Sequence, residues 1–360
     1  MSQTPRPLLG VVGLIVALAA GGLLLMRVPH RAAAPPAGRI SVPDAWPKAQ
    51  RADIAGNLED GAVFTPLYFL DARTALGTAP SPDNRTVRLL LRSPDGKLRL
   101  LRSQPTGTDP EFNNVTMSGD TLIWTESIAE RPVEVWTANL RGGPARRLTA
   151  DTGNPVFYGT QYDLVVAGGR VYWTATARDG SRSTEVRSVS LAGGAVTIRS
   201  EPGIWGLTAW PWIVDGPATG EATRLRSLAD NREIRLPRVG TELLTCSPTW
   251  CRELVTSADG LVRIDLLRPD GTARRQVAGS GAGEAVGDVA LLDRFEILSE
   301  TEPNSDVTGT EGLVIYDLRS GRTVEVSAAV AVAFARGGVL WWSTADEQAP
   351  TWHTLDLRTA

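Results

Sequence analysis

The two cysteines carry the clearest chemistry in this sequence of 360 residues. Cys246 and Cys251 lie in TCSPTWC, at the neck of an expected β-hairpin with the loop SPTW. Residues facing each other on antiparallel strands have Cα atoms about 4.5–5.5 Å apart, within disulfide range. We therefore expect a disulfide, which indicates an oxidising compartment. Two unrelated buried thiols are the alternative, and metal binding is disfavoured because no second cysteine pair is present.

The sequence offers little for hydrolytic or metal-dependent catalysis. Its two histidines are His30 and His353, so a Ser-His-Asp triad would have to use His353. The patterns G-x-S-x-G, H-E-x-x-H and the Walker sequence do not occur. We expect no cofactor and no metal, and an enzyme is the less favoured class. Paired carboxylates keep that class open, since 40 Asp and Glu residues could supply a glycoside hydrolase or a lyase.

Acidic residues gather in the longest expected loop, ETEPNSDVTGTE, over residues 300–311. Glu300, Glu302, Asp306 and Glu311 could hold Ca²⁺, but their spacing does not fit an EF-hand loop. A solvated loop is the simpler interpretation. Together with Tyr158 and Tyr162, the loop nevertheless belongs to the rim that we expect to bind a partner or a ligand.

Aromatic residues give the best indication of a binding surface. IWGLTAWPW, from Ile204, contains Trp210, and Trp250 lies at the same kind of turn one repeat later. If both rings are exposed at adjoining hairpin tips, they form an apolar patch suited to a partner or a membrane. The alternative is that they fill the gap beneath the sheets. Tyr158 and Tyr162, in NPVFYGTQYD, are expected on the opposite rim, facing the central mouth.

A repeat of β-hairpins positions these residues. WTANLRGGPARRLT, from Trp136, returns in outline as VRSVSLAGGAVTIRS from Val186 and LVIYDLRSGRTVEV from Leu313. Each copy joins two β-rich runs through Gly, Asp or Asn, which tolerate positive φ. A second hairpin precedes each copy, with turns near residues 72, 119, 168, 210, 248, 293 and 337. The spacing of roughly 38 to 49 residues is typical of four-stranded blades, so the sequence predicts an all-β, seven-bladed β-propeller, with six blades as the alternative.

Stacking around an axis explains why the blades need one another. A lone four-stranded sheet leaves both faces wet, whereas radial stacking buries both. The last copy lacks a fourth strand after TWHTLDLRTA. We expect RISVPDAW, residues 39–46, to close the ring as the outer strand of the last blade. Pro43 suits such an edge position, where a missing N–H costs little. The propeller is thus predicted over residues 40–360.

The N-terminal region has a different composition. After a short tail, residues 1–7, the uncharged run LLGVVGLIVALAAGGLLLM spans residues 8–26 and nearly crosses a bilayer's hydrocarbon core as a helix. We interpret it as an uncleaved, single-pass transmembrane signal anchor, with a cleaved signal peptide as the alternative. A Pro/Ala-rich tether follows over residues 27–39. Arg27 and Arg31 follow the uncharged run and only Arg6 precedes it, so the positive-inside rule slightly favours a propeller in the cytoplasm. The expected disulfide favours an extracytoplasmic one, and we adopt that placement.

The repeat resembles a known group of propellers. WTANLRGGPARRLTAD and the turns SPDN and SPDG resemble TolB-type and related WD-like repeats, and LIWTE, VYWTA and LWWST resemble the second strand of YWTD-type repeats. The resemblance covers residues 64–360 and extends to membrane-anchored, TolB-like actinobacterial proteins of unknown function. It implies a propeller used for binding in the cell envelope and carries over no site residue.

Net charge and composition limit the partners. The net charge is −3 and no basic block occurs, so nucleic acid is not expected to bind. We expect a propeller anchored in the cell membrane that binds an envelope protein or a small ligand without catalysis. A carboxylate-based propeller enzyme is the alternative.

Overall fold

The computed structural model describes residues 39–129, 131–217, 219–237, 243–258, 260–344 and 350–360. The expected transmembrane helix, residues 8–26, lies outside the described residues; among those described, no helix has the length and apolar character needed to cross a bilayer. The chain divides into two units, Met1–Arg39 and Ile40–Ala360, and the described fold is that of the second.

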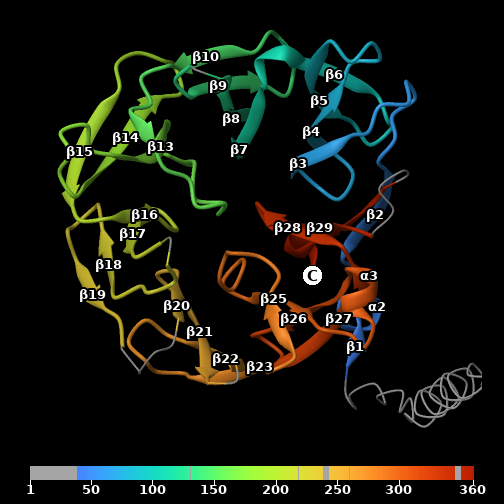
Figure 1. The fold of residues 1–360 in the computed structure, drawn as a ribbon, viewed down its shortest axis with the longest axis vertical. Coiled ribbons are helices and arrows are strands. Elements are labelled where there is room, and N and C mark those ends of the chain that lie inside the picture. Colours follow the sequence, from blue (N-terminus) through green and yellow to red (C-terminus); the bar gives the residue numbers. More distant parts are fainter. Residues whose placement is uncertain (1–38, 130, 218, 238–242, 259, 345–349) are drawn as a thin grey trace, which may run out of the picture. The chain divides into compact units, whose positions relative to one another are not determined.

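Seven sheets form a ring in this unit, as the repeat predicts (Figure 1), and their strands are antiparallel except where β1 (Ile40–Ser41) is added to one sheet. The first strand of each blade lies innermost. Blades 1 to 4 contain β3 (Thr65–Phe69), β4 (Ala75–Pro80), β5 (Thr86–Arg92) and β6 (Leu98–Pro105); β7 (Glu111–Ser118), β8 (Thr121–Ser127), β9 (Glu134–Asn139) and β10 (Arg146–Thr149); β11 (Asn154–Pro155), β12 (Val165–Ala167), β13 (Arg170–Thr176), β14 (Ser183–Ser190) and β15 (Thr197–Pro202); and β16 (Trp205–Leu207), β17 (Trp212–Asp215), β18 (Arg224–Ser227) and β19 (Glu233–Arg235).

Blades 5 to 7 complete the ring and include the chain's N-terminal strands. They contain β20 (Leu243–Cys246), β21 (Cys251–Ser257), β22 (Gly260–Leu267) and β23 (Arg275–Gly279); β24 (Ala282–Glu284), β25 (Phe295–Glu300), β26 (Glu311–Asp317) and β27 (Arg322–Val330), with β1 (Ile40–Ser41) added outside; and β28 (Val332–Arg336), β29 (Val339–Ser343), β30 (Thr351–Asp356) and β2 (Gln50–Ala55). Short helices α2 (Val42–Ala45) and α3 (Ser305–Thr308) and the 3₁₀ turn η1 (Thr106–Thr108) lie between strands, and the 3₁₀ turn η2 (Leu357–Thr359) follows β30.

An N-terminal strand closes the ring, but it lies further along the chain than the predicted residues 39–46. β2 pairs antiparallel with β30 along its whole length and forms the outer strand of blade 7. The segment 39–46 instead supplies β1, which pairs in parallel with β27 of blade 6, and α2. Pro43 explains the difference, because it is favoured in the first turn of a helix and would interrupt a longer strand. QRADIA has no proline and buries Ile54 in the core.

Tryptophan rings fill the widening gaps between blades. Trp124, Trp173 and Trp341 lie on the second strands of blades 2, 3 and 7 and are at most 1% exposed. Neighbouring blades diverge from the axis, so a large flat ring on a second strand occupies space that a smaller side chain would leave empty. These contacts fix the blades that carry the candidate site residues.

Candidate functional site

The inner strand of blade 3 is interrupted by a segment that leaves its sheet. β11 and β12 both pair with β13, and residues 156–164 between them run toward the centre of the ring (Figure 1). We call these residues the axial segment. The Gln161 N–H donates to Asp288 Oδ2 of blade 6 at 3.2 Å, and Gln161 Oε1 accepts from the Gly337 N–H of blade 7 at 3.3 Å. The axial segment therefore connects blade 3 with the two blades opposite it.

Asp163 holds the axial segment in its folded form. Its Oδ1 accepts from the Tyr158 N–H at 2.8 Å, and its Oδ2 accepts from the Gly159 N–H at 2.7 Å. Arg336 of blade 7 donates to the Thr160 carbonyl at 3.3 Å. Burial raises the pKa of Asp163, and the backbone donors and the Arg336 charge oppose that rise. Both oxygens of this carboxylate are thus engaged in folding the segment.

Asp288 is the more unusual carboxylate near the axis. It is 7% exposed, and its Oδ2 accepts from Gln161. Its Oδ1 is buried and has no hydrogen-bond partner among the described residues. Burial raises the pKa of Asp288 to about 6, and the nearby charge of Asp163 adds to the rise. A group with these properties could donate or accept a proton near neutral pH.

A buried arginine from blade 5 fixes the strand that leads to Asp288. Arg252 pairs through Nη1 with Glu296 at 2.8 Å and through Nη2 with Glu284 at 2.7 Å. It also donates to the carbonyls of Val286 and Gly287 at 3.1 and 3.0 Å. Because the Arg252 guanidinium is 1% exposed and Glu296 is fully buried beside it, removing Glu296 would leave a poorly compensated buried charge. The backbone immediately before Asp288 in blade 6 is therefore held against blade 5.

Tyr158 and Tyr162 both lie in the axial segment, which runs toward the centre of the ring (Figure 1). Tyr158 is half-buried beside Gly206, where an added Cβ would come within 3.1 Å of the tyrosine ring. Tyr162 packs against the apolar cluster that contains Trp205 and Leu207. Burial raises the pKa of both phenols. Their rings serve mainly to seat the segment against blade 4.

A cavity of about 510 Å³ lies beside the acidic loop 300–311, between blades 6 and 7. We call it the interblade cavity. Asp306 lines this cavity, whereas the Glu302 side chain is turned toward Gly312. The Glu302 N–H donates to Ser305 Oγ at 2.8 Å. Glu300 and Glu302 are not among the lining residues. The full lining is Glu284, Ala285, Ser299, Thr301, Ser305, Asp306, Gly309, Glu311, Gly312, Leu313, Val330, Ala331, Val332 and Ala333.

The described residues include no group of three or more His, Cys, Asp or Glu side chains arranged to hold a metal ion. The acidic loop therefore does not assemble the calcium site considered from its composition.

Trp210 lies at a second cavity, of about 370 Å³, between blades 3 and 4. We call it the aromatic groove. The Trp210 ring lies 3.9 Å from the Tyr172 ring, centroid to centroid, with the planes tilted by 35°. The lining comprises Arg170, Tyr172, Val186, Ser188, Thr197, Arg199, Trp210, Pro211, Leu228 and Ala229. Trp210 is half-buried, so its ring contributes to an open apolar wall.

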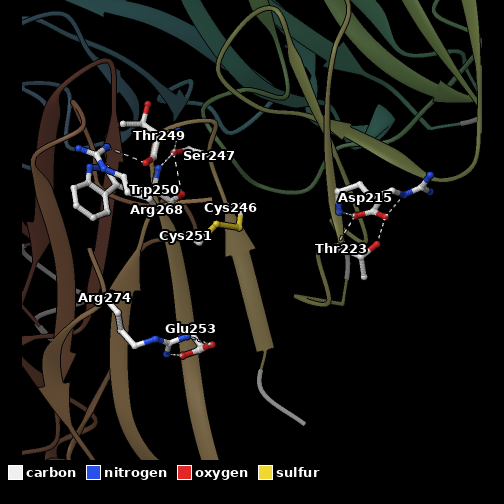
Figure 2. Close-up of a disulfide and its surroundings, with 11 residues drawn as sticks. Asp215, Thr223, Cys246, Ser247, Thr249, Trp250, Cys251, Glu253, Arg268 and Arg274 are labelled. Atoms are coloured by element: carbon white, nitrogen blue, oxygen red, sulfur yellow. Dashed lines mark hydrogen bonds and ion pairs between the residues drawn. A yellow bond between two sulfur atoms is a disulfide. The ribbon is translucent and has the colours of Figure 1, made fainter. Parts of the chain in front are cut away.

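Trp250 does not share an exposed patch with Trp210. The ring is 4% exposed and packs between blades 5 and 6, which corresponds to the alternative in which the tryptophan fills a gap. Figure 2 shows the cause: Ser247 Oγ accepts from the Trp250 N–H at 3.0 Å and turns the chain back. The Arg268 guanidinium lies 3.9 Å above the ring and donates to the Thr249 carbonyl. The expectation that both tryptophans form one surface is therefore not met.

The predicted disulfide between Cys246 and Cys251 is confirmed (Figure 2). The two residues face each other across β20 and β21, and their Cα atoms are 4.0 Å apart. Both side chains are buried in the cluster between blades 4 and 5. The bond closes the hairpin that carries Trp250.

His353 does not assemble a hydrolytic triad. Its Nδ1 lies 2.7 Å from Asp53 Oδ1 across the closing strand pair, and its ring stacks on Trp342 with centroids 5.5 Å apart. The adjacent cavity, of about 400 Å³, contains Thr354 but no serine among its described lining residues. The Thr354 hydroxyl donates to the Ala72 carbonyl at 2.7 Å. A nucleophile for this His–Asp pair is thus missing from the described surroundings.

Comparison with known proteins establishes the fold alone. No protein-family model and no curated protein matches the sequence. An oligogalacturonate lyase in complex with manganese is 10% identical, with a TM-score of 0.50, covering 86% of this chain and 98% of its own. A puromycin-hydrolysing peptidase of Mycobacterium tuberculosis is 12% identical, with a TM-score of 0.51, covering 80% of this chain and 51% of its own. TolB from Acinetobacter baumannii is 10% identical with a TM-score of 0.39, covering 77% and 62%. At these identities the similarity to the lyase and the peptidase shows the propeller fold and does not select a function.

Proposed function

We propose that this chain is a membrane-anchored propeller of the cell envelope that binds a protein or a small ligand without catalysing a reaction. The observation that carries the proposal is the axial segment. Two carboxylates that catalyse glycoside cleavage must both reach the glycosidic bond of the substrate. Here Asp163 uses both oxygens on backbone N–H groups, and Asp288 is 7% exposed and bonded to Gln161. The axial position is occupied by the protein's own chain.

The interblade cavity supports binding at another place on the ring. Its volume of about 510 Å³ falls in the range of small-molecule sites, roughly 300–1,000 Å³. Glu284, Asp306 and Glu311 place carboxylates around it, and Ser299 and Thr301 add hydroxyls. This lining matches a polar ligand rich in hydrogen-bond donors, such as an amine or a polyol. Both the 300–311 loop and the strand ends of two blades contribute to it.

A carboxylate-based enzyme, a glycoside hydrolase or a lyase, is the second candidate. One observation favours it: the pKa of Asp288 is raised to about 6 beside a second carboxylate, a pattern found in general acids. Such an enzyme would lose turnover of polygalacturonate or chromogenic glycosides on Asp288→Asn substitution. A binding module would show no turnover with these substrates in either form.

The ligand site is tested by screening amines, polyols and sugars for a rise in the thermal unfolding midpoint of the full chain. Asp306→Asn combined with Glu311→Gln removes two carboxylates from the interblade cavity and should abolish the rise. Asp83→Asn is the matched control, because Asp83 is exposed on a turn of blade 1. An equal rise in all three proteins would locate the ligand elsewhere and contradict this site.

The extracytoplasmic placement is supported by the disulfide and by the uncharged run at residues 8–26. Val307→Cys supplies a test, since Val307 is 88% exposed and both native cysteines are bonded to each other. A membrane-impermeant maleimide should label this variant in intact cells and should not label the native chain. Labelling that requires cell lysis would place the propeller in the cytoplasm.

A further inference from the structure

The aromatic groove has a composition different from that of the interblade cavity. Tyr172 and Trp210 form an aromatic wall, and Val186, Pro211 and Leu228 extend the apolar surface around it. Stacked rings of this kind favour flat or branched apolar side chains over small polar molecules. The groove therefore indicates an occupant with an apolar group.

Arg170 adds an available positive charge to this groove. Its Nε donates to Ser188 Oγ at 3.1 Å, and its Nη2 donates to the Ser188 carbonyl and to Thr197 Oγ1 at 3.0 and 2.9 Å. All three acceptors are neutral. Its Nη1 has no acceptor, and its guanidinium pairs with no acidic group, within the described part of the chain. These bonds orient the guanidinium and leave two N–H donors for a ligand.

Arg199, the other arginine of the groove, uses each of its guanidinium nitrogens in hydrogen bonds within the protein. Its Nε donates to Glu201 at 2.6 Å, while Nη1 and Nη2 donate to the Leu228 carbonyl and to Asn231 Oδ1 at 2.5 and 2.6 Å. These bonds tie blade 3 to blade 4 beneath the groove. The contrast assigns anion binding to Arg170 and a structural role to Arg199.

The position of the groove favours an extended chain as the occupant. Thr197 and Arg199 line it from β15, which is the terminal strand of the blade 3 sheet. Terminal strands present backbone donors and acceptors that a segment of another protein can pair with.

We propose that the aromatic groove binds a segment of a partner protein in which an apolar or aromatic side chain neighbours an acidic residue. The apolar side chain packs on Tyr172 and Trp210, and the carboxylate accepts from Arg170 Nη1. The site lies apart from the interblade cavity, so it stands even if that cavity binds nothing. It depends on the proposed function only in that the propeller is a binding protein.

The test uses the full chain in a mild neutral detergent and fluorescein-labelled ten-residue peptides with the core Glu-Trp-Glu. Anisotropy should show saturable binding. Peptides with Lys-Trp-Lys or Glu-Ala-Glu cores should bind at least about tenfold more weakly, since a charge-assisted hydrogen bond or a stacked ring is lost. Equal binding of all three peptides, or no binding of the first, would overturn the proposal.

Two variants locate the binding on the groove. Arg170→Gln should weaken the Glu-Trp-Glu peptide about tenfold or more. Thr197→Glu keeps Arg170 but puts a competing carboxylate beside it at an exposed strand position, so it should also weaken binding. Arg141→Gln removes the same charge from an exposed turn of blade 2 and should bind like the native chain.

Unchanged binding by both groove variants would show that the peptide binds elsewhere and would refute the assignment. Binding of indole-3-acetate that depends on Arg170, with no binding of the peptide, would identify a small aromatic acid as the occupant and would refute the protein partner.

Discussion

Replacing Asp288 by Asn should stabilise the propeller at neutral pH. Asp288 is buried near the axis, one of its oxygens has no partner among the described residues, and burial raises its pKa to about 6 from an ordinary value of 3.8. A raised pKa in an acid means that the ionised form is disfavoured in the folded state. Asn keeps an oxygen to accept the Gln161 N–H and removes the buried charge.

The size of the effect follows from linkage. The difference between the folded pKa of about 6 and the unfolded value of 3.8 corresponds to about 3 kcal/mol at 1.36 kcal/mol per unit. This cost is fully present above pH 6, where Asp288 is ionised in both states. It falls as the pH drops from 6 toward 4, because the folded protein takes up the proton first. The Asn amide remains buried with one unsatisfied group, which costs about 1–3 kcal/mol and lowers the net gain.

The measurement is the thermal unfolding midpoint of the native chain and of Asp288→Asn between pH 4.5 and 8. About 1 kcal/mol of the cost remains at pH 4.5, so about 2 kcal/mol develops between pH 4.5 and pH 8. At roughly 2 °C per kcal/mol for a large domain, the variant should gain about 4 °C relative to the native chain over this range. Taking the difference between the two proteins cancels the titrations of groups that do not interact with Asp288; Asp163, whose charge raises the pKa of Asp288, contributes to the difference. A difference that does not vary with pH, or one that moves in favour of the native chain as pH rises, would contradict the argument.

Two further predictions concern the covalent and hydrogen-bonded closures of the fold. Replacing both Cys246 and Cys251 by Ala should lower the free energy of unfolding by about 2 kcal/mol, from the chain entropy of a six-residue loop, and reductant should destabilise the native chain but not this variant; equal stability of the two proteins without reductant would show that the bond contributes little. Ile54→Asp on the closing strand β2 should lower the unfolding midpoint more than Ile40→Asp on β1, because Ile54 is 7% exposed and Ile40 is only partly buried; the reverse order would indicate that β1 is the more important closure.

The sequence was sufficient to predict the blades because their signals are local. Each hairpin needs two β-rich runs and a turn that tolerates positive φ, and these features lie within about fifteen residues of one another. The disulfide was predictable for the same reason, since Cys246 and Cys251 face each other across a single turn. The need for an outer strand from elsewhere in the chain was also predictable, because the last repeat supplies three strands and a blade needs four.

The closing strand was misplaced because two segments met the same requirement. Both RISVPDAW and QRADIA are short, lie before the first blade and could extend along an edge. What separates them is Pro43, which the sequence predicts at the edge of a sheet and which lies instead in the first turn of α2. Proline is poorly suited to an interior strand, because it lacks the N–H that a neighbouring strand would pair with.

Trp210 and Trp250 lie at similar turns but have different surroundings. The repeat places both at the first hairpin of a blade, but the exposure of each ring depends on which side chains of the neighbouring blade cover it. Arg268 and the blade 6 core cover Trp250, whereas Trp210 meets Tyr172 at the rim of an open groove. These contacts join residues of different strands and blades, so repeat spacing alone does not decide which aromatic ring is available to a partner.

The axial segment shows most clearly why the binding surfaces had to come from the structure. Gln161 bonds to residues 127 and 176 positions away, and no local pattern encodes such pairs. Because the segment joins blade 3 to the opposite blades, the ring is braced across its centre as well as closed at its edge by β2. This brace places the protein's own chain near the axis of the ring. Both the interblade cavity and the aromatic groove lie instead between neighbouring blades.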